Sequence, residues 1–301
     1  MTSYLLRRTL AALLFVAVVS TSAVILTRLA PGDATLGMKA QGYGEAQIAA
    51  ERARLGLDRP IHEQVLIWLR GLVHLDLGQT RARQPVRALV FDAAVNTAIL
   101  ASMALLIATA LGVPIGILTG ARPHGWLARI VLPISIALVA CPPIVGALAL
   151  LLLAVETGWL SVAPGSLALP ALALALPIAA SLERLQSQAT SETLAGPEIT
   201  AAAARGVPPS RLVWIHAARQ SLRPVLGVYG IVIASLFSGS LAVEVITSWP
   251  GLGRLMASAL TGREVFLTAG CALAGAILIA AGNLVADVLR AIADPRLRGR
   301  A

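Results

Sequence analysis

The stretch from Ala93 to Ala121 reads AAVNTAILASMALLIATALGVPIGILTGA and contains no charged residue. A helix of this length exceeds the roughly 20 residues needed to cross about 30 Å of hydrocarbon. Six uncharged runs of about 19 to 29 residues occur in the chain, at Thr9–Thr27, Ala93–Ala121, Ile130–Val155, Thr157–Leu182, Pro224–Val243 and Val265–Ala286. A backbone in lipid must satisfy its own hydrogen bonds, and outside closed barrels only helices do so. The sequence therefore predicts an all-α integral membrane protein with six transmembrane helices.

The composition of the 301 residues agrees with this prediction. Hydrophobic residues make up 57% of the chain and charged residues only 13%, against about 25% charged in soluble domains, and the mean hydropathy is +0.81. The net charge of +9 would suggest a nucleic-acid partner in a soluble protein. Here the positions of the arginines relative to the apolar runs explain it, and no nucleic-acid partner is expected.

The arginines predict the orientation of the chain in the membrane. They are frequent at the N-terminus, in the short connection Arg122–Arg129, around Pro197–Pro224 and in the C-terminal tail, whereas Glu156–Ser166 has none. Positively charged short loops stay in the cytoplasm. We therefore expect both termini and the Pro197–Pro224 segment inside. The segment Arg28–Arg87 after the first helix is expected outside, since the arginines of a long segment weigh little in this rule.

The longest polar interruption in the second half is Pro197–Pro224, PEITAAAARGVPPSRLVWIHAARQSLRP. An alanine-rich helix is expected to end at Gly206, followed by Pro208 and Pro209, and a second helix is expected to begin with Ser210 as its N-cap and to stop at Pro224. In the outer segment, a second pattern predicts an amphipathic helix over Ile61–Leu72.

Several motifs in this order resemble the permease subunits of bacterial ABC importers, in the branch that handles peptides and nickel. In the Pro197–Pro224 segment the matching residues are Ala202, Ala204, Arg205, Gly206, His216, Arg219 and Pro224. Further matches are Gly56–Pro60, Gln64 with Trp68, Asp76–Thr80, Glu244 with Pro250–Gly253, and Asp287 with Asp294–Arg298. The chain departs from the family at Leu75, where a glycine is usual. The resemblance covers nearly the whole chain.

The resemblance implies a type-1 importer permease with three parts. Residues 1–92 would form the first span and an extracytoplasmic insertion, residues 93–290 the permease core with its coupling loop at 197–224, and residues 291–301 a cytoplasmic tail. The loop residues named above, with Arg211, would contact the ATPase. The external mouth or gate would be formed by Glu244, Trp249, Pro250, Gly251 and Gly253.

The resemblance also implies the partners and the location. These are a second homologous permease, giving a heterodimer, two ABC ATPase subunits, an external solute-binding protein and the lipid of the inner membrane. The only lysine, Lys39, is followed by Ala40, so the chain lacks the Lys-Ser/Thr pair of a phosphate-binding loop. We therefore expect no enzymatic activity in this chain, no cofactor and no metal, with ATP hydrolysed by separate subunits.

Other functions stay open at this point. An ion-coupled secondary transporter usually needs an ionisable group near the middle of the membrane, whereas this sequence places such groups near the ends of the apolar runs, at Asp92, Glu156, Glu183, Arg184, Glu244 and Asp287. An intramembrane enzyme is disfavoured because all four histidines fall outside the runs. If the chain is an importer permease, di- or oligopeptides are the expected solute, and nickel or another small solute is the alternative.

Overall fold

The structure is a computed structural model that describes residues 2–163 and 165–293. Within the described residues every secondary-structure element is a helix, and there is no β-strand. In chain order the helices are α1 (Thr2–Leu29), α2 (Leu36–Ala40), α3 (Glu45–Arg54), α4 (Ile61–His74), α5 (Val86–Ala121), α6 (Trp126–Ala140), α7 (Pro143–Thr157), α8 (Ala168–Leu194), α9 (Pro197–Ala204), α10 (Pro209–Arg211), the π-helix η1 (Leu212–Ala217), α11 (Ala218–Ile246), α12 (Leu252–Thr261) and α13 (Val265–Ala293).

The predicted all-α membrane fold is confirmed. Within the described residues, five helical stretches are long and apolar enough to cross a membrane, and the bent pair of α6 and α7 makes a sixth candidate. The chain divides into two compact units, one of Met1–Ala98 with Pro250–Ala280 and the other of Ile99–Trp249 with Ala281–Ala301. The helices α5 and α13 each contribute to both units, and each unit is described by itself below.

The first unit is built around the amphipathic helix α4, which lies against α1. Trp68 of α4 is 1% exposed, and its indole Nε1–H donates a hydrogen bond of 3.3 Å to Ser20 Oγ on α1. The Trp68 ring also stacks on Phe266 of α13, with centroids 6.2 Å apart. The predicted helix over Ile61–Leu72 is thus confirmed, and Val65, Trp68 and Leu72 on one of its faces pack into the apolar cluster of this unit.

The second unit has the later part of α5 packed against α8 through a row of glycines. Gly112, Gly116 and Gly120 are four residues apart and therefore share one face of α5. A Cβ atom built on them would lie 2.5, 2.6 and 2.3 Å from the carbonyl oxygens of Ala179, Glu183 and Ser187, respectively. These carbonyls are also spaced by four residues, so the two backbones run alongside each other in contact. Only glycine allows this approach.

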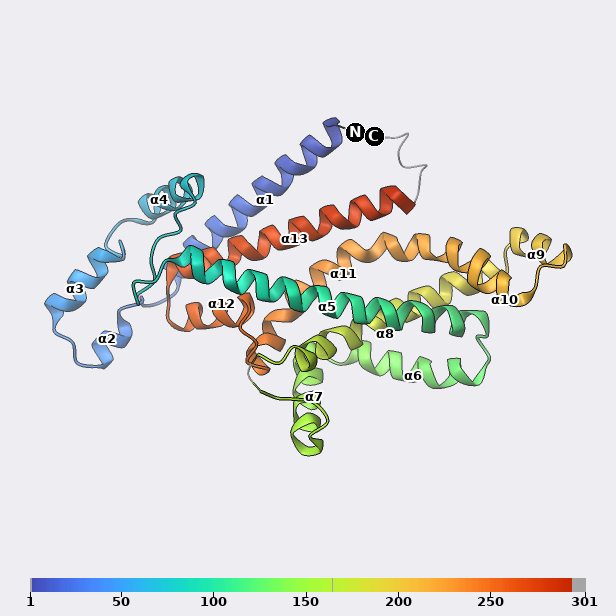
Figure 1. Ribbon diagram of the computed structural model, residues 1–301. Coiled ribbons are helices and arrows are strands. Elements are labelled where there is room, and N and C mark those ends of the chain that lie inside the picture. The colour runs from blue at the N-terminus through green and yellow to red at the C-terminus, as the bar shows by residue number, and fades with distance from the viewer. Residues whose placement is uncertain (1, 164, 294–301) are drawn as a thin grey trace. The chain divides into compact units, whose positions relative to one another are not determined.

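The predicted span Ile130–Val155 is not one straight helix. It breaks at Cys141–Pro142, and α6 and α7 meet there at an angle of 112° (Figure 1). Pro142 and Pro143 have no N–H to donate to the preceding turn, and a residue before proline is driven away from helical geometry. Cys141 and Pro142 accordingly have extended ψ values of 122° and 139°. Consecutive prolines therefore end the first helix and begin the second.

The helix after Gly206 differs from the prediction at both of its ends. It is capped by Pro208 with Pro209 in the first helical position, rather than by Ser210, because proline's fixed φ suits a first turn whose N–H groups are free anyway. It also continues past Pro224 as one stretch from Pro209 to Ile246. Proline removes one backbone hydrogen bond, and the buried packing of α11 on α8 holds the helix together through that position.

Candidate functional site

The end of α9 is a sharp backbone turn centred on Gly206. The Gly206 N–H donates to Ala203 O at 2.9 Å and the Val207 N–H donates to Ala202 O at 3.3 Å, which is the hydrogen-bond pattern of a Schellman motif. Gly206 has φ +82°, a left-handed conformation that favours glycine. The predicted break at Gly206 is therefore confirmed, together with its backbone cause.

A small apolar cluster holds this turn against the following helix. Ile199 and Ala202 of α9 and Leu212 of η1 are buried together, with Leu194 and Val207 packed against them. A polar contact supports the cluster, because Gln220 Nε2 donates to Glu198 Oε2 at 2.6 Å. The α9 turn is therefore fixed to the helices on either side of it. The Glu198–Gln220 pair was not predicted, because a spacing of 22 residues across a turn gives no periodic signal.

The residues predicted for this loop lie on its outer surface, with one exception. Ala202 is 4% exposed and belongs to the apolar cluster. The others are all exposed in the structure, namely Ala204, Arg205, Gly206, Arg211, His216, Arg219 and Pro224. The loop therefore presents a polar surface that carries arginines, and Ala202 packs in the apolar cluster beneath this surface. Figure 1 shows α9 at the same end of its unit as the turn between α5 and α6.

The π-helix η1 interrupts the regular hydrogen bonding directly after this loop. It contains His216, one of the residues predicted for the loop, but the π-helical geometry itself was not predicted. Such widened turns arise within α-helices where one residue too many must be accommodated, and they are frequent at functional sites. Here the widened turn lies between α10 and the long helix α11.

The residues predicted for the mouth fall in two groups along the chain. Glu244 and Trp249 belong to the second unit and are buried, at 0% and 7% exposure. They lie on the turn that ends α11, where the Trp249 N–H donates to Glu244 O at 3.0 Å. Ser248 between them has φ +56°. The chain thus ends the helix in a left-handed residue other than glycine, which costs about 1–2 kcal/mol in isolation.

Pro250, Gly251 and Gly253 belong to the first unit, where Gly251 is the N-cap of α12 and Gly253 lies in its first turn. Asn96 Nδ2 on α5 donates to Pro250 O at 2.9 Å, and the Leu252 N–H donates to Thr97 Oγ1 at 2.8 Å. The first N–H groups of a helix lack partners within the helix, and Thr97 provides one from another helix. Asn96 and Thr97 were not predicted, because they lie inside an apolar run that is distant in sequence.

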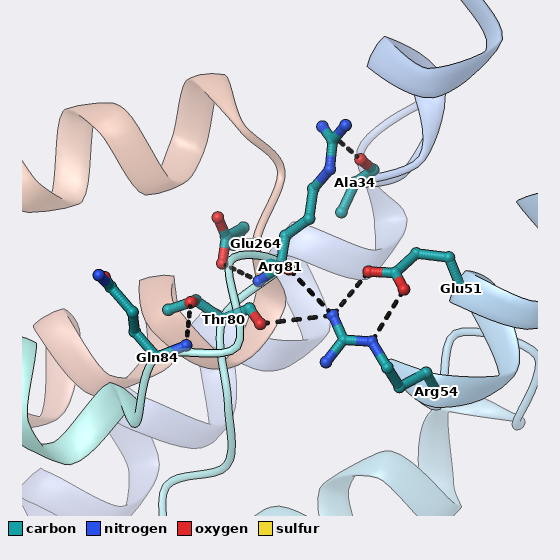
Figure 2. A network of polar contacts seen from close by, with 7 residues as sticks. All are labelled: Ala34, Glu51, Arg54, Thr80, Arg81, Gln84 and Glu264. Carbon is teal, nitrogen blue, oxygen red and sulfur yellow. Dashed lines mark hydrogen bonds and ion pairs between the residues drawn. The ribbon is translucent and has the colours of Figure 1, made fainter. Parts of the chain in front are cut away.

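The segment between α1 and α5 is organised by Arg54 (Figure 2). Its guanidinium makes two hydrogen bonds to Glu51, of 2.6 and 2.8 Å, and also donates to the carbonyls of Thr80 and Arg81. The Arg81 N–H in turn donates to Glu264 Oε2 at 3.1 Å. The hydrogen bonds from Arg54 hold the pKa of the Glu51 carboxyl below its ordinary value. This network joins α3, the loop before α5 and the turn between α12 and α13.

Glu183 directly follows the predicted span Thr157–Leu182, but the helix does not end there. Because α8 begins at Ala168 and continues to Leu194, Glu183 lies inside the helix and is 5% exposed. Its carboxylate accepts hydrogen bonds from Thr119 Oγ1 at 2.7 Å and Ser135 Oγ at 2.8 Å. A buried carboxylate requires such partners, and these two join α8 to α5 and α6.

The long apolar helices, with an exposed basic loop between two of them, define a multi-pass membrane protein. The chain matches the family described as the binding-protein-dependent transport system inner membrane component over residues 112–299. It matches the N-terminal region of such membrane components over residues 1–104. The chain therefore belongs to this family, and the predicted resemblance is confirmed.

Three relatives illustrate the range of the family. The chain is 29% identical to the oligopeptide transport system permease protein AppB of Bacillus subtilis (strain 168), over 99% of each chain. It is 29% identical to the di/tripeptide transport system permease protein DppB of Pseudomonas aeruginosa (strain UCBPP-PA14), over 91% of this chain and 92% of the relative. It is 27% identical to the nickel import system permease protein NikB of Staphylococcus aureus (strain USA300), over 93% and 87%.

The chain is thus a permease subunit of an ABC importer in the inner membrane, a transport subunit and not an enzyme. Membership of this family implies a complex that contains an ATPase and a solute-binding protein.

Proposed function

We propose that this chain forms half of the pathway by which an ATP-driven importer takes up short peptides. The observation that carries the ATP-driven part is the α9 turn, in which Gly206 has φ +82° and exposed arginines lie over a buried apolar cluster. The peptide part is supported by the relatives AppB and DppB, whose names specify oligopeptides and di- or tripeptides. Nickel, named for NikB, is the alternative solute.

In this proposal the α9 turn is the contact with the ATPase. Arg205 and Arg211 meet acidic or carbonyl groups of the ATPase, and rigid-body movement of the docked ATPase is passed to α8 and α11. The apolar cluster under the turn makes such transmission effective, because α9 cannot move independently of Leu194 and Leu212. One chain has one such loop, so a second homologous permease and two ATPase subunits complete the importer.

The parts of the chain then have distinct roles. Residues 1–92 form the first span and an extracytoplasmic insertion, and residues 93–290 form the permease core with the coupling segment 197–224. Glu244, Trp249, Pro250, Gly251 and Gly253 form the external mouth, to which the solute-binding protein delivers its cargo. The proposed cytoplasmic tail, residues 291–301, includes Asp294–Arg298, which lies outside the described residues.

The proposed orientation predicts the side from which two positions react. Cysteines placed singly at Gln41, next to α2, and at Ser210, in α10, should react with a membrane-impermeant thiol reagent from opposite sides, because arginine-rich short loops remain in the cytoplasm. The measurement is labelling of intact cells against inside-out vesicles, after replacement of Cys141 and Cys271. Labelling of both positions from one side would contradict the orientation and the coupling role of the loop.

A reconstituted importer tests the function itself. The purified chain alone is expected to hydrolyse no ATP. Together with a second permease and ATPase subunits, it is expected to support hydrolysis that increases when a peptide-loaded binding protein is added. Uptake of radiolabelled trialanine and of radioactive Ni²⁺ is measured in the same proteoliposomes. Uptake of nickel but not of trialanine would make nickel the solute in place of peptides. ATP hydrolysis by the chain alone would contradict the proposal that separate subunits hydrolyse ATP.

A further inference from the structure

A groove of about 690 Å³ runs between α6 and α8 in the second unit. One side is apolar and comes from α6, through residues such as Leu132 and Val139, while α8 supplies polar and charged side chains. The groove extends along α8 from Ser181 to Glu192 and reaches Pro123, in the turn between α5 and α6. Figure 1 shows that turn at the end of the unit where α9 lies. Its volume lies within the range of small-ligand sites, about 300–1,000 Å³.

The polar side of the groove is a regular stripe. Ser181, Arg184, Gln188 and Glu192 are spaced by three, four and four residues, which puts them on one face of α8, and all four are exposed. Exposure of such a face to hydrocarbon is strongly unfavourable, and polar residues of membrane helices usually line water-filled cavities. We infer that this part of the groove is aqueous.

The charged residues at the groove differ in whether they already have a hydrogen-bond partner. Glu192 accepts a hydrogen bond of 3.0 Å from Gln188 Nε2. Glu183, also at the groove, directs its carboxylate to Thr119 and Ser135 instead. For Arg184, no hydrogen bond or ion pair is found with any of the residues that the structure describes. A guanidinium on a helix within the membrane then retains its full capacity to bind a carboxylate with two parallel hydrogen bonds.

We propose that this groove binds a short zwitterionic peptide on its way out of the importer, with the peptide carboxylate at Arg184 and its ammonium group at Glu192. Eight residues of α-helix separate these two by about 12 Å, and an extended chain of three residues covers about 10 Å. The groove therefore fits di- and tripeptides. This inference rests on the proposed function and deepens it, since a guanidinium and a carboxylate about two turns apart match the two charged ends of a short peptide, whereas a bare divalent cation would make no use of Arg184.

The test measures the charge of the groove and its occupancy separately. Ser181→Cys is introduced into a chain with Cys141→Ser and Cys271→Ala, and the full importer is studied in inside-out membrane vesicles. The rates of labelling by an anionic and a cationic methanethiosulfonate reagent are compared. One charge at the roughly 5–6 Å that separates positions 181 and 184 changes such rates about threefold in water. Arg184→Gln should thus slow the anionic reagent and speed the cationic one by about this factor each.

Two further variants make the comparison specific. Arg184→Lys retains the charge and should restore the original preference for the anionic reagent. Arg87→Gln, an exposed arginine at the start of α5, removes the same charge elsewhere and should leave both rates unchanged. Triglycine should protect the introduced cysteine from labelling, whereas N-acetyl-triglycine amide, which lacks both terminal charges, should not. Arg184→Gln should abolish the protection.

The outcomes separate this inference from the proposed function. If trialanine is taken up but triglycine does not protect the cysteine introduced by Ser181→Cys, the groove is not a peptide site and the inference fails alone. If that cysteine becomes reactive only when the second permease is removed, the stripe is a contact between subunits, which also overturns the inference. If no peptide is taken up, the proposed function fails, even where the charge preference at position 181 persists.

Discussion

Gly116→Leu is expected to leave little folded chain in the membrane and to abolish transport. A Cβ at this position would lie 2.6 Å from Glu183 O and 2.7 Å from Gln186 Cβ, and the oxygen belongs to the backbone, so it cannot rotate away. The helices α5 and α8 must therefore move apart. Overpacking a close contact typically costs about 1–3 kcal/mol, occasionally more, and here the separation also strains the hydrogen bond between Thr119 and Glu183, 2.7 Å long.

The measurement is the thermal unfolding of the purified chain, together with its yield in the membrane. The control is Gly227→Leu, because Gly227 is also inside a membrane helix, α11, and a Cβ there meets no atom within 4 Å. Its unfolding temperature should hardly change. Gly116→Ala should lie between the two, since one methyl group requires a smaller separation. Equal stability of Gly116→Leu and Gly227→Leu would mean that α5 and α8 do not touch as described.

The sequence predicted the helices well because their physical signal is local. Uncharged runs identify membrane helices wherever they occur, and the run Ala93–Ala121 lies within the observed helix α5. The break between α6 and α7 is also a local effect of Pro142 and Pro143. The sequence predicted one span over Ile130–Val155, since proline chemistry disrupts a helix without specifying whether the chain bends slightly or by 112°.

The features that the sequence did not reveal depend on contacts between distant segments. No local pattern around Glu183 indicates that Thr119 and Ser135 supply its hydrogen bonds, so its burial inside α8 was not predicted. The same is true of Thr97, which caps α12. Residues far apart in sequence create these sites, and a single sequence carries no periodic pattern for them.

Leu75 shows how a departure from a family pattern acquires a physical meaning. The family usually has glycine here, and the structure places Leu75 at φ +55°, as the left-handed residue that ends α4. A leucine in this conformation costs roughly 1–2 kcal/mol. The turn nevertheless forms, because the following Asp76 N–H donates to Gly71 O at 2.9 Å and Asp76 Oδ1 accepts from the Gly78 N–H at 3.0 Å.

Gly206→Asp is expected to leave the permease inserted and folded but to abolish uptake. A Cβ at Gly206 meets no atom within 4 Å, so the substitution disturbs no packing. Its φ of +82° adds about 1–2 kcal/mol of local backbone strain. In the proposed importer the larger effect arises at the contact with the ATPase, where a new negative charge opposes the surface presented by Arg205 and Arg211. The ATPase should then detach, or hydrolyse ATP without moving solute.

Three comparisons separate this uncoupling from simple strain. Gly158→Asp places the same residue at a helix end with φ +65° and equally open surroundings, so it carries similar strain and the same charge, and its uptake should stay near wild type. Gly125→Asp alters the other loop expected in the cytoplasm, where aspartate suits the N-cap position before α6. Gly206→Asn keeps the shape without the charge and should retain part of the activity. Uptake and copurified ATPase are measured at matched membrane levels, and normal uptake by Gly206→Asp would show that the loop only connects two spans.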